Sequence, residues 1–112
     1  MASRTFIDFY RKTDVANTVT FTDTDGNAYD CTGGTLRLLI KENFDDDDAD
    51  ALLDESFSPG GVGMNVFSVV LTNAETDLTA GEYYEGVQFT STAGIIWVVF
   101  QGRMSVMAKL FE

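Results

Sequence analysis

The sequence has no histidine, one cysteine and one proline, and its longest apolar run, residues 95–100, has only six members. Without histidine, the usual general base of serine and cysteine nucleophiles is missing. One cysteine allows no internal disulfide, and a single thiol without histidine cannot complete a zinc site. A membrane-spanning helix needs about 20 apolar residues. These absences predict no catalytic residue, no cofactor and no membrane contact.

Basic residues are also few, because 7 Lys and Arg stand against 18 Asp and Glu and give a net charge of −11. Such a chain repels phosphate backbones and offers no basic stripe, so nucleic acid is not predicted as a partner. The same charge opposes nonspecific association. A length of 112 residues with 45% hydrophobic content is typical of one folded domain, which we predict to span residues 1–112.

Several segments alternate polar and apolar residues with a period of two, as half-buried strands do. In residues 35–41, Leu36, Leu38 and Ile40 share one face. Comparable extended segments are predicted at residues 17–22, 28–29, 66–71, 83–90, 95–100 and 103–110. About seven short strands without a long helix predict an all-β protein, an antiparallel two-sheet sandwich of immunoglobulin-like type. A small barrel is the alternative.

Two features interrupt this pattern. Residues 42–65 are acidic and then rich in glycine, which predicts a long loop insertion that becomes ordered on assembly, with at most a short helix near residues 49–53. Glu85 shares the parity of Tyr83 and Val87. We therefore expect Glu85 to lie at the sheet margin, or a bulge to shift the register there.

Candidate metal ligands are confined to Asp23, Asp25 and Asn27, whose spacing is similar to the start of a calcium loop. Gly26 falls at the fourth position of that loop instead of the sixth, and no glutamate stands at the twelfth, so an ordinary Asp-Gly turn is favoured. Cys31 is predicted to be a buried apolar residue. No metal site is predicted, and these three residues are weak candidates only.

Residues 95–100 are apolar on both parities, which is unusual for a surface strand of a monomer. Either another chain covers one face, or the strand is central and lies under the loop of residues 42–65. We predict an interface formed by Ile96, Val98 and Phe100, with Trp97 turned toward the core.

Short motifs along the chain resemble small phage tail and baseplate modules. The first half carries them at residues 6–12 (Phe-Ile-Asp-Phe-Tyr-Arg-Lys), at residues 19–30 with the Asp-Gly-Asn turn, and at residues 31–37 (Cys-Thr-Gly-Gly-Thr-Leu-Arg). Residues 78–84 are similar to the family's Leu-x-x-Gly-x-Tyr-Tyr step. The family named by this resemblance is the amino-terminal immunoglobulin-like domain of phage baseplate upper proteins. Cys31, where the family has leucine, and the acidic loop depart from it.

The resemblance implies a bacteriophage virion structural protein of the tail, baseplate, neck or fibre attachment, without enzyme activity. Its implied partners are other virion proteins and further copies of itself, and its implied location is the virion, assembled in the host cytoplasm. A capsid decoration or head-fibre protein is an alternative within the same class. A calcium- or carbohydrate-binding module, using exposed aromatics such as Tyr84 or Tyr29, is an alternative from another class.

Overall fold

The computed structural model describes residues 8–108 and 110 and shows an all-β chain. Its strands are β1 (Phe9–Tyr10), β2 (Val15–Thr20), β3 (Thr35–Lys41), β4 (Leu53–Phe57), β5 (Val66–Leu71), β6 (Gly81–Thr90) and β7 (Ile96–Met107). One 3-10 turn, η1 (Asp48–Asp50), precedes β4, and the described residues form no α-helix. No helix in this part of the chain is long and apolar enough to cross a membrane.

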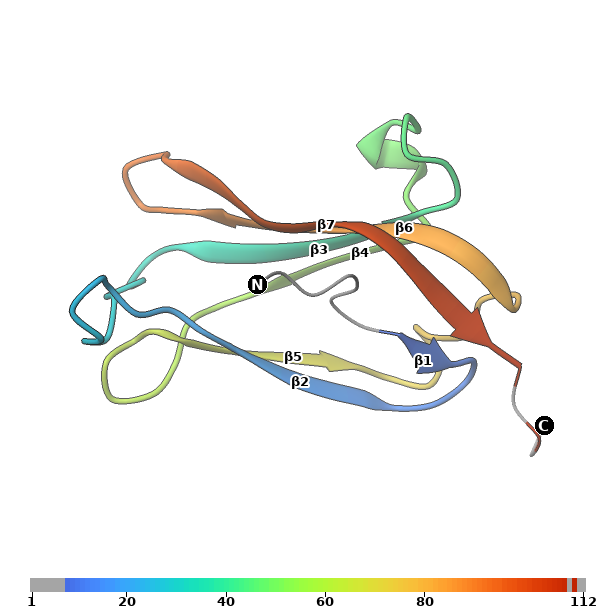
Figure 1. The fold of residues 1–112 in the computed structure, drawn as a ribbon, viewed down its shortest axis with the longest axis horizontal. Helices are drawn as coiled ribbons and strands as arrows, with labels where there is room; N and C mark the ends of the chain where they lie inside the picture. The colour runs from blue at the N-terminus through green and yellow to red at the C-terminus, as the bar shows by residue number, and fades with distance from the viewer. Residues whose placement is uncertain (1–7, 109, 111–112) are drawn as a thin grey trace.

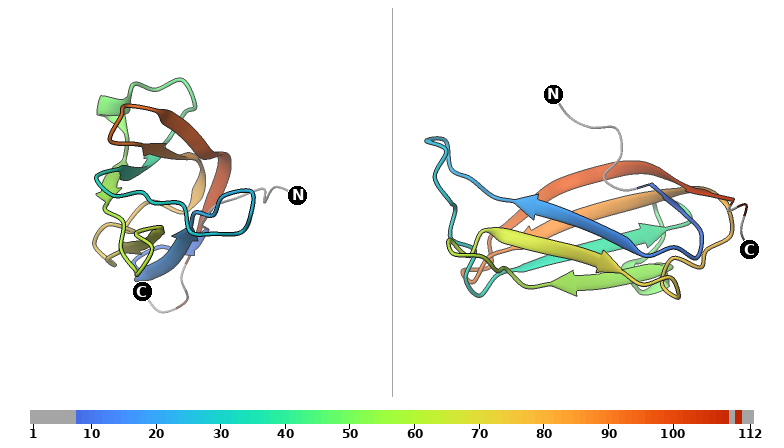
Figure 2. Two further views of the ribbon diagram at one scale, coloured as in Figure 1. Left: turned by 90° about the vertical axis from the view of Figure 1, so that its left-hand side faces the viewer. Right: turned by 90° about the horizontal axis from the view of Figure 1, so that it is seen from below.

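The strands form a five-stranded sheet in the order β1-β7-β6-β3-β4 and a two-stranded sheet of β2 and β5 (Figure 1). Figure 2 shows the larger sheet curling around the smaller one as a half-barrel. All pairs are antiparallel except β1 with β7, which run parallel. The all-β class and the number of strands are confirmed. The expectation of purely antiparallel sheets is wrong, because β1 pairs in parallel with the last residues of β7.

The core fills the space between the two sheets. Leu36, Leu38 and Ile40 of β3 are buried as their shared parity predicts. The sheets meet through three phenylalanine rings, since Phe67 of β5 lies 5.5 Å from Phe21 and 5.9 Å from Phe89 of β6, measured between ring centroids. Aromatic pairs at these separations add to the free energy of burying their area.

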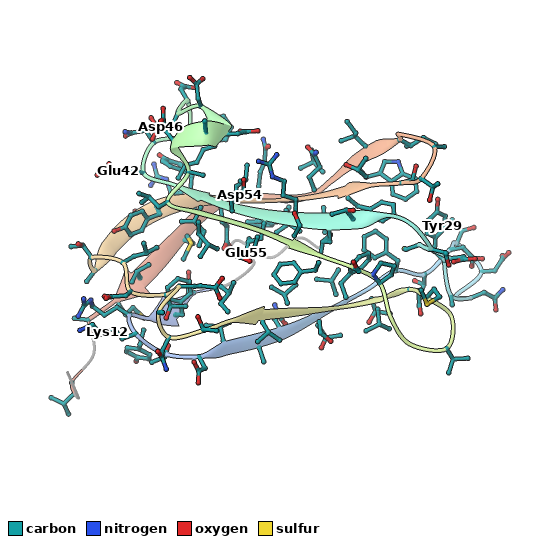
Figure 3. The ribbon with its side chains drawn as sticks, turned by 180° about the vertical axis from the view of Figure 1, so that it is seen from behind. Lys12, Tyr29, Glu42, Asp46, Asp54 and Glu55 are labelled. Carbon is teal, nitrogen blue, oxygen red and sulfur yellow. The ribbon has the colours of Figure 1, made fainter. Side chains whose placement is uncertain are left out.

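The segment of residues 42–65 is not one continuous loop, because β4 forms within it. β4 pairs with β3, and its alternation places Leu53 in the core while Asp54 lies on the outer face, where it accepts two hydrogen bonds from the Arg37 guanidinium. The acidic composition of this segment did not predict a strand. The ion pair that neutralises Asp54 comes from Arg37 on the neighbouring strand, which local composition does not reveal. Figure 3 shows Asp54 and Glu55 on β4, beyond the acidic turn that carries Glu42 and Asp46.

A second difference concerns β7, where two strands separated by Gly102 were expected and one long strand is found. Gly102 pairs with Glu85 of β6 without interrupting the ladder. Glu85 itself is buried on the inner face together with Tyr83 and Val87. It therefore does not lie at the margin, and the bulge that does occur is located after Val87, where it leaves Glu85 on the inner face.

A buried hydroxyl joins the turn after β1 to the turn after β5. Thr76 is fully buried, and its Oγ1 donates to the Thr13 carbonyl oxygen at 2.6 Å and accepts from the Thr13 amide at 3.0 Å. Beside it, Arg11 donates to the Asp77 carboxylate at 2.6 Å. These contacts fix the position of β2 relative to β6, because both turns lead directly into those strands.

Replacing Thr76 by valine should lower the free energy of unfolding by about 1–3 kcal/mol, because the isosteric side chain leaves the amide and carbonyl of Thr13 without their buried partner. Urea unfolding followed by tryptophan fluorescence measures this change. Thr79→Val is the matched control, since Thr79 is exposed and its hydroxyl makes no hydrogen bond within the described residues. Equal stability of the two variants would contradict the proposed role of Thr76.

Candidate functional site

The most prominent surface feature is a row of exposed apolar side chains at the start of β7, which we call the β7 edge strip. It consists of Ile95, Ile96, Trp97, Val98 and Val99. Ile96 and Val98 are 58% and 60% exposed, and even Trp97, which packs against Phe89 and Tyr29, is 39% exposed. Both faces of this segment therefore reach the surface.

The strip is also a free sheet edge. β6 pairs with one side of β7, whereas β1 pairs with the other side only at Val106 and Met107. The Asp8 carboxylate accepts a hydrogen bond from the Ser105 amide at 2.8 Å. In the part of the chain that the structure describes, no strand pairs with this side of β7 before that point. Unpaired amides and carbonyls next to apolar side chains favour the addition of another strand.

Ile96, Val98 and Phe100, the three predicted interface residues, do not share a face. Val98 pairs with Gln88 and Phe100 pairs with Val87, so Val99 is an extra residue that forms a β-bulge. The bulge leaves Ile96 and Val98 on the outer face but turns Phe100 inward, where it packs against the core. The prediction that Trp97 turns inward is confirmed by its contact with Phe89.

The acidic turn of residues 42–52 does not cover the strip. It is held over β3 by Lys41, whose Nζ donates to the Asp46 carbonyl oxygen at 2.7 Å and to Asp48 Oδ1 at 2.8 Å. Hydrogen bonding to Lys41 holds the pKa of the Asp48 carboxyl below its usual value. The alternative of a central strand under this segment is therefore wrong, because β7 is an edge strand where the strip begins.

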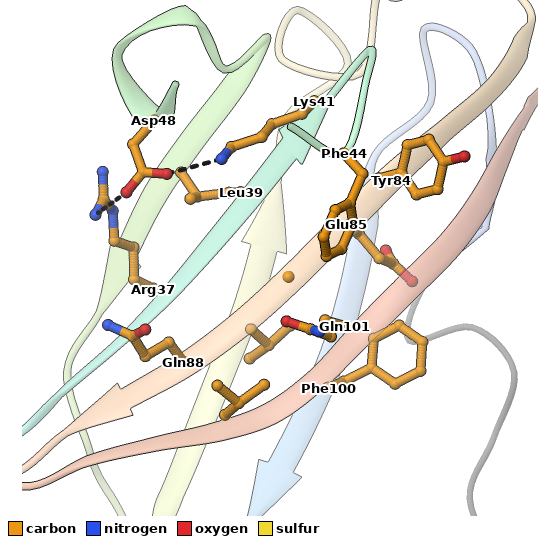
Figure 4. Close-up of a pocket in the computed structure, with 13 residues that line it drawn as sticks. Arg37, Leu39, Lys41, Phe44, Asp48, Tyr84, Glu85, Gln88, Phe100 and Gln101 are labelled. Atoms are coloured by element: carbon orange, nitrogen blue, oxygen red, sulfur yellow. Dashed lines mark hydrogen bonds and ion pairs between the residues drawn. The ribbon is translucent and has the colours of Figure 1, made fainter. Parts of the chain in front are cut away.

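Between this turn and the outer face of β6 and β7 lies a hollow of about 200 Å³ (Figure 4). Phe44 stands at its rim edge-on to Tyr84, with ring centroids 5.8 Å apart. Gln88 and Gln101 line the floor, and neither amide side chain makes a hydrogen bond within the described residues. The hollow thus combines exposed aromatic carbon with free polar groups. No spacing pattern in the sequence predicts it, because its residues come from separate strands.

The three metal candidates form a turn. Asp23 Oδ1 accepts hydrogen bonds from the amides of Asp25 and Asn27, both at 2.9 Å, and Gly26 has a φ of 84°, in the left-handed region. One oxygen of Asp23 is thus engaged by the backbone. Among the described residues, no group of three histidine, cysteine or carboxylate side chains is placed to hold a metal ion.

Cys31 is buried, as predicted, and its amide donates to the Met64 carbonyl oxygen. Burial disfavours the thiolate and raises the pKa of the Cys31 thiol. Cys31 is therefore a core residue.

Two carboxyl groups meet beside β4. Glu55 faces Glu75 in the turn after β5, and a hydrogen bond between them, possible only when one is protonated, raises the pKa of Glu55. Hydrogen bonds from the backbone of Thr72 lower the pKa of Glu75, so Glu75 holds its charge and Glu55 takes the proton. The stability gained from protonating Glu55 is present at acidic pH and is lost as the pH rises through its folded pKa.

Glu55→Gln should therefore stabilise the protein at pH 7 by up to about 1 kcal/mol, because the amide keeps a donor toward Glu75 and removes the repulsion between two half-buried charges. The gain should disappear near pH 4, where Glu55 is itself protonated. Thermal unfolding at both pH values measures it. Glu42→Gln, which removes an exposed charge elsewhere, controls for net charge, and an equal gain in both variants would refute the pairing.

No protein-family model and no curated protein sequence matches this chain.

Proposed function

We propose that this chain is a structural component of a bacteriophage virion, in the tail, baseplate, neck or fibre attachment, and that it acts through protein contacts without enzyme activity. We further propose that its fold is a variant of the immunoglobulin-like sandwich implied by the family resemblance. The observation that carries the contact function is the β7 edge strip, which exposes apolar side chains along the unpaired edge of β7.

A free apolar edge is a hazard for an isolated protein, because edge strands template pairing with other chains. Proteins commonly protect such edges with charge, yet residues 95–102 contain no charged side chain in a chain of net charge −11. The acidic surface elsewhere keeps molecules apart. The neutral strip is therefore the surface on which a neighbouring subunit would meet the least repulsion, as expected for a part of an ordered assembly.

The location of the protein in particles tests this proposal. In a phage that encodes this chain, gold-labelled antibody should mark the tail tip or neck, whereas label spread over the head would support the capsid decoration or head-fibre alternative. If mass spectrometry finds no copy of the protein in the particles, both the tail proposal and the capsid decoration or head-fibre alternative are overturned.

Incorporation should also depend on the strip. The double variant Ile96→Lys/Val98→Lys should be depleted at least tenfold from particles, because two charges would be buried in the docked edge. Val70→Lys is the matched control, since Val70 is an equally accessible apolar residue on β5, 53% exposed, and should be incorporated normally. Thermal unfolding verifies that each variant is folded. Normal incorporation of the double variant would refute a role for the strip.

The hollow favours a second candidate function, a carbohydrate-binding module. Phe44 offers an exposed ring for the apolar face of a sugar, and Gln88 and Gln101 offer donors and acceptors for its hydroxyls. Calcium binding has no comparable support, because Asp23 serves its own turn.

A titration with neutral mono- and disaccharides, followed by amide chemical shifts, tests this candidate. We expect shifts that cluster on β6 and β7 around the hollow and that Phe44→Ala weakens at least fivefold. Tyr10→Ala removes a ring of equal exposure, 53%, on β1 and should leave the shifts unchanged. Absence of saturable shifts in the wild-type protein would exclude the candidate.

A further inference from the structure

We infer that the occupant of the β7 edge strip is a second copy of the same chain, paired antiparallel across a two-fold axis that passes through Trp97. This inference rests on the proposed function and specifies its first contact. The two strips would add their free edges to each other and join two five-stranded sheets into one continuous sheet, so that the unpaired amides and carbonyls of each copy bond to the other.

Strand geometry limits the register to very few choices. Residues opposite each other in an antiparallel pair project to the same face, so a two-fold axis must pass through a residue pair of identical number. Trp97 is the midpoint of the strip. With the axis there, Ile96 of each copy faces Val98 of the other on the outer face, and the two Trp97 rings meet on the inner face.

This register matches the exposure pattern. Ile96 and Val98 are the most exposed members of the strip. Across the two-fold axis they form two identical cross-strand pairs, each between Ile96 of one copy and Val98 of the other. Apolar and β-branched pairs of this kind are among the favourable cross-strand neighbours. Ile95, which directly precedes β7, would lie opposite Val99, so each of the five strip residues would lie opposite a strip residue of the other copy.

Charge also favours this face for contact between like copies. Two molecules of net charge −11 repel each other, but from Ile95 to Gly102 the edge carries no charge. The other edge of the large sheet, β4, carries Asp54 and Glu55, and pairing two such edges would bring carboxylates together. The strip is therefore the edge at which self-pairing meets the least repulsion.

The rest of the sheet leaves room for the second copy. β1 occupies the edge of β7 only at Val106 and Met107, at the end of β7 opposite to the β6–β7 turn (Figure 1). In an antiparallel pair centred on Trp97, the partner's β1 lies beyond the turn of residues 91–94. Neither copy's β1 therefore blocks the other strip.

The pair should be weak in isolation. Stable dimers bury roughly 800 Å² on each partner, more than a strip of five residues supplies, and the acidic turns near Tyr29 add repulsion. We therefore expect a reversible dimer whose population rises with protein concentration and with salt, because salt screens the repulsion between the copies. Many copies in an assembly would strengthen such a contact through multivalency.

Disulfide trapping tests the register. Ile96→Cys chains mixed with Val98→Cys chains, one of them carrying a tag, should form mixed disulfide dimers at least tenfold faster than either variant alone, because residues 96 and 98 face each other only between copies. Val70→Cys, an exposed thiol outside the strip, is the control for random collision, and wild-type protein controls for Cys31. Equal rates in all samples would overturn the inference.

Sedimentation equilibrium of the full wild-type chain provides the second test. A dimer that grows with salt and is absent in Ile96→Lys/Val98→Lys supports the pair. A chain that stays monomeric at all concentrations overturns it. Monomeric wild-type protein whose incorporation into particles still needs Ile96 and Val98 would refute the second copy but keep the proposed function.

Discussion

The contact between Phe67 and the pair Phe21 and Phe89 holds the two sheets together, and the positions of the surface elements depend on it. β2 and β5 pair only with each other, so the small sheet is joined to the large one through side chains and turns. The larger sheet curls over these rings without closing into a barrel. It therefore keeps two separate edges, β1 with β7 on one side and β4 on the other. One edge of β7 stays unpaired over most of its length because the sheet does not close.

Strands with simple alternation were predictable from the sequence. β3 and β5 begin and end at the predicted residues, because their buried positions alternate without interruption. β4 was missed because the partners of its carboxylates are distant in sequence: Asp54 pairs with Arg37, and Glu55 shares a hydrogen bond with Glu75. Local composition carries no signal of such partners. The continuity of β7 through Gly102 was missed for a related reason, since pairing with β6 outweighs a weak local preference.

The candidate site was predicted in part. The apolar run of residues 95–100 left two alternatives, a face covered by another chain or a central strand under residues 42–65, and the exposure of Ile96 and Val98 excludes the second. Phe100 was assigned to the wrong face because the period of two assumes an unbroken ladder. The hollow under Phe44 was not foreseen, since it depends on how the acidic turn folds back over β3 through Lys41.

The bulge at Val99 separates two roles within a single strand. On one side of it, β7 supplies Met104 and Val106 to the core, and on the other side it presents Ile96 and Val98 at the surface. The two halves are thereby independent in register. Insertion or loss of one residue near Val99 would exchange the side chains displayed at the edge while the core half stayed in place, which gives related chains a simple route to new docking partners.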